Sequence, residues 1–171
     1  GFTHTNKGHW NLCHIPLLPV TGTPTPGDYC SPFSHERESA APGYYQVFLD
    51  RYGVDAQLSS TLRCAFHKYA YPAGAAASLL ADLQRSNEHV RAWDIRKEGD
   101  NVFAGWQQTG EKMYFYAVAN RPVTGIEPVV EGDREVRIVR FGEGDGALEL
   151  RIGFSFVSEK NARENLEAEM L

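Results

Sequence analysis

The run ALELRIGFSF at residues 147–156 constrains the fold more than any other stretch of the chain. Its large apolar residues occupy every second position: Leu148, Leu150, Ile152, Phe154 and Phe156. Successive side chains of a β-strand point to opposite faces, so this period of two predicts a strand with one buried face. The run EVRIVRF precedes it across the loop GEGDG, which is typical of a hairpin turn. The end of the chain is therefore predicted to build an antiparallel sheet.

Short segments of the same β character recur from residue 44 onward. Turn-forming sequences such as EGDN and TGE separate them, and β-branched and aromatic residues are frequent within them. The predicted strand segments are 44–50, 56–71, 78–83, 90–97, 102–108, 112–120, 135–141 and 147–156. This spacing predicts a mainly β, antiparallel sandwich or barrel whose core occupies residues 44–157.

The period of the sequence changes after the last predicted strand. Ser158 can cap a helix, and Glu159 suits its positive end. The apolar residues that follow recur every fourth position: Ala162, Leu166 and Met170. Residues 158–171 are therefore predicted to form a helix. No glycine or proline ends its apolar stripe, so we expect a linker helix that continues towards a second domain.

Residues 1–43 differ in character from the rest of the chain. Six of the nine prolines lie here, which predicts extended or irregular backbone over much of the segment. A compact domain keeps so long an irregular segment when the segment packs on a neighbour or lines a site. We therefore expect residues 1–43 to pack on the sandwich and to face the functional site.

Composition excludes two classes of partner. The formal net charge of −5, without any long run of lysine or arginine, argues against a nucleic-acid partner. No apolar stretch approaches the roughly 20 residues that span a bilayer, so no membrane partner is expected. Three cysteines, Cys13, Cys30 and Cys64, form no CxxC pattern, and their odd number leaves at least one without a partner inside the chain.

Three histidines, His4, His9 and His14, recur every five residues and raise the question of a metal site. Five residues advance about 140° around a helix and change face on a strand, so neither element aligns all three. A loop could gather them, but no further ligand follows at a zinc spacing. We predict no metal site here, and we expect His67, which lies among aromatic residues, to belong to the core.

The loop FSHERES offers His35, Glu36 and Glu38 as an acid–base group. Acid–base carboxylates are set by three-dimensional spacing that neighbouring loop positions do not guarantee. The favoured interpretation is a loop whose polar groups are satisfied locally, with Arg37 offsetting the carboxylates. No nucleophile elbow, P-loop, dinucleotide fingerprint or HExxH motif occurs in the chain.

Tryptophans are better candidates for ligand contacts, because an indole presents a large flat surface and one donor to a sugar ring. Trp93 and Trp106 lie in predicted strands and are expected in the core. Trp10 lies in the proline-rich segment and is the favoured ligand contact.

Four stretches resemble consecutive parts of a known family. They are GFTHTNKGHWNLCHIPLLPVTG, FSHERESAAPGYYQVFLD, LSSTLRCAFHKYAYP and IGFSFVSEKNARENLEAE. In order and spacing they resemble the N-terminal domain of glycoside hydrolase family 92, a family of calcium-dependent, exo-acting α-mannosidases. The resemblance implies a galactose-mutarotase-like β-sandwich, packed through the linker helix onto an (α/α)6 barrel.

The resemblance also implies what this chain is not expected to contain. Family members invert the anomeric centre, which requires an acid and a base about 6.5–9.5 Å apart. Both carboxylates, and most ligands of the calcium that holds the mannose, belong to the C-terminal barrel in this family. No catalytic residue and no metal ligand is therefore expected here, and calcium is expected only in the parent enzyme. The family implies a mannose-containing glycan as substrate, with α-1,2 linkage favoured and N-glycan degradation as the setting, and a periplasmic or secreted location.

The resemblance carries four residues over as candidate contacts to sugar or to the barrel: His4, Thr5, Asn6 and Trp10. The chain departs from the family where small, glycine-rich residues commonly follow the HTH-like motif, and it has Arg37 where asparagine is commoner. Two other functions stay open on the sequence. One is a free-standing carbohydrate-binding sandwich that uses Trp10, and the other is a purely structural domain whose aromatic residues are all core.

Overall fold

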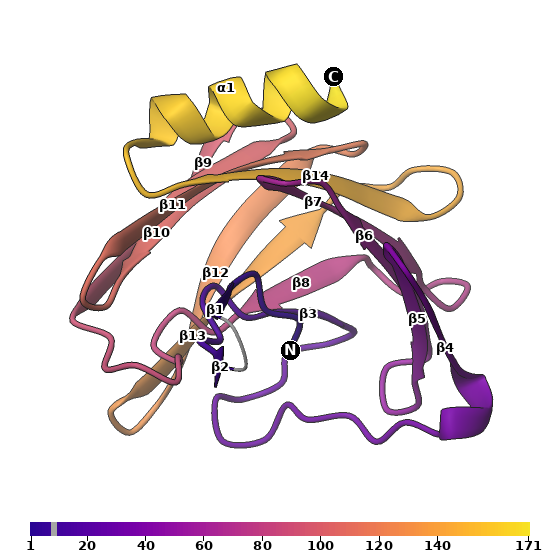
Figure 1. Cartoon of the computed structure of the whole chain (residues 1–171). Helices are drawn as coiled ribbons and strands as arrows, with labels where there is room; N and C mark the ends of the chain where they lie inside the picture. The colour runs from indigo at the N-terminus through magenta and orange to yellow at the C-terminus, as the bar shows by residue number, and fades with distance from the viewer. Residues whose placement is uncertain (8–9) are drawn as a thin grey trace.

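A computed structural model describes residues 1–7 and 10–171 of the chain, and Figure 1 shows two curved sheets packed face to face. The larger sheet has the order β4 (Glu38–Ala41), β5 (Tyr44–Leu49), β6 (Val54–Ser60), β7 (Cys64–Ala70), β14 (Leu148–Ser155), β11 (Lys112–Ala119), β10 (Val102–Gln108) and β9 (Ala92–Gly99). The smaller sheet has the order β12 (Val123–Glu131), β13 (Arg134–Phe141), β8 (Ser78–Ala81) and β3 (Leu17–Val20). The described strand pairs are antiparallel, which confirms the predicted mainly β sandwich.

Apolar residues of the facing strands fill the space between the sheets. On β14 the predicted alternation is confirmed, because Leu148, Leu150 and Ile152 are wholly buried. The prediction is wrong for Phe156, which is 54% exposed. The pairing of β14 with β11 ends at Ser155, so Phe156 already lies in the turn that leads away from the sheet.

Residues 1–43 contain more regular structure than their prolines predict. They include β3, β4 and a two-stranded hairpin of β1 (Asn6–Lys7) and β2 (Trp10–Asn11), besides the short 3₁₀ helix η1 (His35–Arg37). The sandwich therefore begins before residue 44. Pro19 fits inside β3 because β3 is an edge strand, where one side of the backbone needs no partner strand.

Strand β12 was not predicted from the sequence. It contains Gly125 and Pro128, two residues that are depleted in strands. β12 is the other edge of the smaller sheet and pairs with β13 on one side only. An edge position tolerates the missing N–H of Pro128, so the local signal against a strand was overridden by pairing.

The helix α1 (Glu159–Met170) follows the last strand as predicted and lies across the outer face of the larger sheet (Figure 1). The Ser158 hydroxyl accepts a hydrogen bond from the N–H of Asn161 at 3.0 Å and so caps the helix. Arg96 of β9 donates two hydrogen bonds to Glu159, at 2.7 and 2.8 Å. In the described part of the chain, no helix has both the length and the apolar character that a membrane crossing demands.

Candidate functional site

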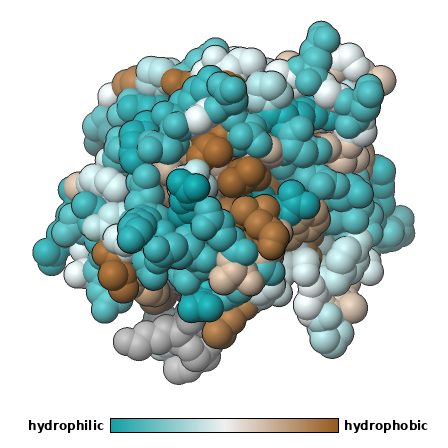
Figure 2. All heavy atoms as spheres, turned by 90° about the horizontal axis from the view of Figure 1, so that it is seen from above, coloured by the Kyte–Doolittle hydropathy of each residue, from teal (hydrophilic) through white to brown (hydrophobic). Residues whose placement is uncertain are grey.

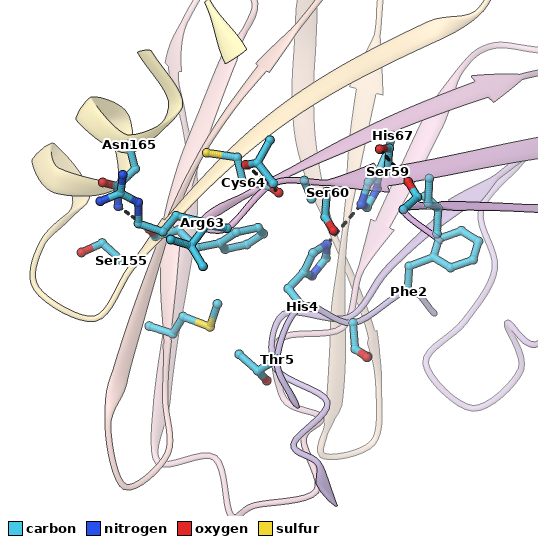
Figure 3. Close-up of a pocket in the computed structure, with 18 of the residues that line it drawn as sticks. Phe2, His4, Thr5, Ser59, Ser60, Arg63, Cys64, His67, Ser155 and Asn165 are labelled. Atoms are coloured by element: carbon cyan, nitrogen blue, oxygen red, sulfur yellow. Dashed lines mark hydrogen bonds between the residues drawn. The ribbon is translucent and has the colours of Figure 1, made fainter. Parts of the chain in front are cut away.

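A cleft of about 820 Å³ opens at one end of the larger sheet (Figure 3). Residues 2–5 form one wall, and the turn between β6 and β7 forms a second. The third wall is the connection from β14 to α1, with Asn161 and Asn165 of the helix. The cleft therefore joins segments from the beginning, the middle and the end of the chain.

The start of the chain is fastened to the segment that leads into β3. The N–H of Phe2 donates to the carbonyl of Leu17 at 2.7 Å, and the N–H of Leu17 donates back at 2.9 Å. The N–H of His4 donates to the carbonyl of His14 at 3.1 Å. These bonds hold residues 2–5 against the sandwich and leave His4 and Thr5 on the wall of the cleft.

His4 and His67 are stacked on the inner wall of the cleft, with ring centroids 5.2 Å apart (Figure 3). The carbonyl of Ile15 can only accept, so Nδ1 of His4 carries the proton in their 2.8 Å hydrogen bond. Nε2 of a neutral His4 then accepts from Nε2–H of His67 at 3.3 Å. Nδ1 of His67 in turn accepts from the hydroxyl of Tyr69 at 2.5 Å. The chain of hydrogen bonds thus assigns one neutral tautomer to each ring.

Burial explains why both rings stay neutral. Removal from water lowers the pKa of His4 from 6.5 to about 4, because the charged form loses its hydration. Burial lowers the pKa of His67 well below its ordinary value, and the neighbouring His4 lowers it further. His67 was expected in the core, and it is 2% exposed.

The backbone is strained around Ile15, whose carbonyl accepts the hydrogen bond from His4. Cys13 and Ile15 have positive φ angles of 55° and 50°, which are unfavourable for residues with a β-carbon. The buried amide of Gln107 enforces this path, because its Oε1 accepts from the N–H of Ile15 at 2.8 Å. Nε2 of His14 lies 2.7 Å from a carboxylate oxygen of Glu88. Strain held by tertiary contacts is typical of functional segments.

The four candidate contacts, His4, Thr5, Asn6 and Trp10, lie within residues 4–10. His4 and Thr5 line the cleft. Asn6 is on β1 opposite Asn11, which also lines the cleft. Trp10 precedes Asn11 on β2 and is 66% exposed. Trp10 itself is not among the residues that line the cleft.

Of the three regularly spaced histidines, His4 and His14 have different partners. His4 contacts His67, whereas His14 contacts Glu88. His9 lies outside the described residues. Within residues 1–7 and 10–171, no three His, Cys, Asp or Glu side chains form a group that could hold a metal ion. On the described residues, a calcium site of six to eight oxygen ligands would lack such a group of side chains.

The loop at residues 33–39 satisfies its polar groups locally. Nδ1 of His35 lies 2.6 Å from Glu38, and the hydroxyl of Tyr45 donates to the same carboxylate at 2.5 Å. These two bonds, first the one from Tyr45, lower the pKa of Glu38. Arg37 was expected to offset the carboxylates of this loop. That prediction is wrong, because the guanidinium of Arg37 lies 3.4 Å from the ring centroid of Phe48.

The other tryptophans are less buried than predicted. Trp93 is partly buried against the core, with the guanidinium of Arg137 4.8 Å from its ring. Trp106 is partly buried, and the ammonium of Lys112 lies 3.8 Å from its ring. Both rings lie on strands and are partly exposed, and each has a cation over its electron-rich face. All three cysteines are free thiols.

The cleft is rich in hydroxyl and amide groups and contains aromatic rings. Sequence reasoning missed most of these residues, because they lie far apart in the chain: Tyr44, Tyr45, Ser59, Ser60, Thr61, Arg63, Asn161 and Asn165. No Asp or Glu is among the described residues that line it. Hydroxyls, amides and aromatic faces suit a neutral, hydroxyl-rich ligand such as a sugar. The described lining does not supply the two carboxylates of a glycosidase.

Glu169 near the end of α1 fixes the second wall of the cleft. Its carboxylate accepts from the hydroxyl of Thr61, from Nε of Arg63 at 2.6 Å and from the N–H of Arg63 at 3.1 Å. These bonds, first the one from Thr61, lower the pKa of Glu169 from 4.5 to about 2. The carboxylate of Glu169 thus links the end of α1 to the turn between β6 and β7.

Glu169→Gln is expected to loosen this turn, because a neutral amide cannot accept all three bonds. The N–H of Arg63 should exchange with solvent deuterium about tenfold faster, as measured by NMR. Glu167→Gln is the matched control, since Glu167 pairs with Arg163 on the exposed side of the helix. Equal exchange rates at the Arg63 N–H in both variants would show that the hydrogen bonds of Glu169 do not hold the turn.

Comparison with known proteins identifies the family of this fold and cleft. The family model of the glycosyl hydrolase family 92 N-terminal domain matches residues 1–163. None of the curated proteins matches the chain. The matched range contains the hairpin, the cleft walls formed by residues 2–5 and by the β6–β7 turn, and both sheets.

Solved structures show the same sandwich. The family GH92 α-mannosidase BT3965 from Bacteroides thetaiotaomicron aligns with a TM-score of 0.82 and 24% identity, over 92% of this chain and 26% of its own. The inverting mannosidase BT2199 of the same organism gives 0.76 and 21%, over 91% and 23%. The family glycosyl hydrolase ccman5 gives 0.78 and 24%, over 92% and 25%. The chain thus spans about a quarter of the length of these structures, and the likeness establishes the fold.

The two comparisons agree on one domain. The family model covers nearly the whole chain, and the structural match covers 92% of it. The resemblance in the four sequence stretches is thereby confirmed, and the chain belongs to glycosyl hydrolase family 92, as an N-terminal domain of that family.

Proposed function

We propose that this chain is the N-terminal domain of an inverting, exo-acting α-mannosidase that removes terminal mannose, with α-1,2 linkage preferred, from glycans. The family match over residues 1–163 carries the proposal. The matched BT3965 structure has also been determined in complex with mannoimidazole, and BT2199 is described as an inverting mannosidase. The proposed setting is N-glycan degradation in the periplasm or outside the cell.

Inversion at the anomeric carbon uses one carboxylic acid and one carboxylate about 6.5–9.5 Å apart, with a water between carboxylate and sugar. The described lining of the cleft has neither group, so both are assigned to a C-terminal catalytic barrel of the same polypeptide. Calcium is assigned to that barrel as well, where it would hold the sugar hydroxyls. On this proposal the 171-residue chain alone is inactive.

The contribution of this domain is one wall of the substrate pocket. The hydroxyl of Thr5 lines the cleft and can meet a sugar hydroxyl, whereas neutral His4, whose two ring nitrogens bind Ile15 and His67, adds an uncharged ring to the same wall. Exposed Trp10 precedes the lining residue Asn11 on β2, and on this proposal its indole stacks on the apolar face of a sugar ring. Hydrogen bonds orient the sugar, and the aromatic surface excludes water from it.

The decisive experiment is mannose release from α-1,2-linked mannobiose with calcium present. The 171-residue chain and the full-length enzyme are compared under the same conditions. Release by the full-length enzyme alone is expected. Turnover by the 171-residue chain would overturn the assignment of the carboxylates to another domain. Release by neither protein, combined with measurable sugar binding by the 171-residue chain, would favour a free-standing carbohydrate-binding module.

Trp10→Ala in the full-length enzyme is expected to raise the KM about tenfold and to change kcat little, because stacking contributes on the order of 1 kcal/mol to binding. Steady-state kinetics on mannobiose measure both constants. Phe33→Ala is the matched control, since Phe33 is another exposed aromatic residue but lies outside the hairpin of β1 and β2. An unchanged KM for Trp10→Ala would favour a purely structural N-terminal domain.

A further inference from the structure

Hydrophilic side chains cover most of the face seen in Figure 2, and hydrophobic ones reach the surface near its centre. Trp10, at 66% exposed, is among the large hydrophobic residues that the fold leaves outside its core. It lies on β2, and among the described strands β1 and β2 pair only with each other. A two-stranded hairpin alone is only marginally stable in water, so contacts elsewhere must fix the place at which it holds Trp10.

The backbone that leaves β2 is bound by the β8–β9 connection, residues 82–91. The side-chain amide of Asn87 donates to the carbonyl of Asn11 at 2.5 Å, and its N–H donates to the carbonyl of Leu12 at 3.0 Å. The hydroxyl of Ser86 donates to the same carbonyl of Leu12 at 2.8 Å. Two successive carbonyls at the end of the hairpin thus receive three hydrogen bonds from two residues of the connection.

Gln107 of β10 fixes the β8–β9 connection to the larger sheet. Its Nε2 donates to the carbonyls of Leu83 and Arg85, both at 2.9 Å, while its Oε1 accepts from the N–H of Ile15. Gln107 is 1% exposed, and this set uses both donors and the acceptor of its amide. A buried polar group with all its partners in place is rigid, so the connection and Ile15 are held at a fixed offset from β10.

The backbone that follows the hairpin needs such support. The positive φ angles of Cys13 and Ile15 are unfavourable, and such a conformation persists where surrounding contacts determine it. The N–H of Cys13 donates to Oδ1 of Asn11 at 2.9 Å, so the strained bend and the last residue of β2 are joined. Loss of the contacts from the connection would therefore let the bend relax and the hairpin move.

We propose that Asn87 is a positioning residue for the sugar contact assigned to Trp10, with Ser86 and Gln107 holding its loop in place; this inference rests on the proposed function. Asn87 acts on the backbone that follows Trp10 and does not itself touch the sugar. A ring that is already in place loses less conformational entropy when it stacks on a ligand. Because the stacking is a binding contact, loss of the positioning is expected to raise the KM and to change kcat little.

A double-mutant cycle in the full-length enzyme tests whether Asn87 acts through Trp10. Asn87→Ala removes the hydrogen bond to Asn11 from an exposed loop position and is expected to raise the KM for mannobiose about fivefold. In a Trp10→Ala background the same change should leave the KM within about twofold, because no ring is left to position. Equal factors in the two backgrounds would show that Asn87 acts independently of Trp10 and would overturn the proposal.

Hydrogen exchange in the 171-residue chain tests the positioning without relying on activity. The N–H of Cys13, which binds the side chain of Asn11, is expected to exchange about tenfold faster in Asn87→Ala, as measured by NMR. Asn87→Asp keeps the shape of the side chain but lacks the donor, and should match Asn87→Ala. Asn120→Ala is the control, since Asn120 also binds backbone groups through its side chain, at the end of β11, and should leave Cys13 unchanged.

The outcomes separate this inference from the proposed function. Unchanged exchange at Cys13 in both Asn87 variants would overturn the positioning role, even if the full-length enzyme released mannose. Faster exchange at Cys13, combined with a full-length protein that released no mannose, would overturn the activity and support the anchoring of the hairpin by Asn87.

Discussion

Acidification from pH 7 to pH 4 is expected to lower the free energy of unfolding of this chain by about 3 kcal/mol through His4. The pKa of His4 is about 4 in the folded chain and 6.5 for an exposed histidine. Between these values the unfolded chain binds a proton that the folded chain does not bind, so stability falls as the pH falls. His67 has a lowered pKa as well and acts in the same direction. Urea unfolding at a series of pH values measures the loss.

Among the described residues, the hydrogen bonds and ring contacts of the two rings include no carboxylate. His4 meets the carbonyl of Ile15, the ring of His67 and the ring of Phe154, and His67 also meets Tyr69 and Phe2. His4→Phe removes the titrating group and should flatten the pH dependence between 6.5 and 4, although the lost hydrogen bond lowers stability by about 1 kcal/mol at pH 7. His89→Gln, at an exposed histidine, is the control and should leave the dependence as it is. A wild-type chain of equal stability at pH 7 and pH 4 would contradict the neutral tautomers assigned here.

Gly153→Ala is expected to destabilise the chain by about 3 kcal/mol and to displace α1 from the sheet. A β-carbon at Gly153 would lie 2.1 Å from the carbonyl oxygen of Ala162 and 2.9 Å from the β-carbon of Leu166. Both neighbours belong to the helix, and the nearer one is backbone, so relief requires movement of the helix itself. Thermal and urea unfolding measure the loss.

Gly142→Ala is the matched control for this prediction. Its β-carbon would have Pro122 and Thr124 at 3.6 Å, which is ordinary van der Waals contact. Such a change stabilises by up to about 1 kcal/mol when the backbone permits it, because alanine restricts the unfolded chain. If Gly153→Ala were as stable as Gly142→Ala, the close approach of α1 to β14 would be refuted. A displaced helix would also loosen the turn between β6 and β7, which depends on Glu169.

Local periodicity identified most of the regular structure. The alternation in residues 148–154 and the four-residue repeat of α1 are properties of the backbone, since side chains alternate along a strand and recur along a helix. A cap at Ser158 is equally local. Local sequence failed to predict two strands in which pairing with a neighbouring strand outweighs the low strand propensity of proline. They are β12 with Pro128 and β3 with Pro19. Both are edge strands, and the sequence does not say which strand will be at an edge.

For the candidate site too, part follows from the local sequence and part only from the packing of the elements. The sequence by itself determined a β-sandwich followed by a helix, the family, and the segment from His4 to Trp10 as the candidate contact region. Only the tertiary structure decided that His4 stacks on a histidine 63 positions away, that Glu169 fastens a turn more than 100 residues earlier, and that Phe156 faces outward. Periodicity reports which face of its own element a side chain occupies. Partners across the chain are set by how the sheets and the helix pack, and burial, pKa and the shape of the cleft follow from those partners.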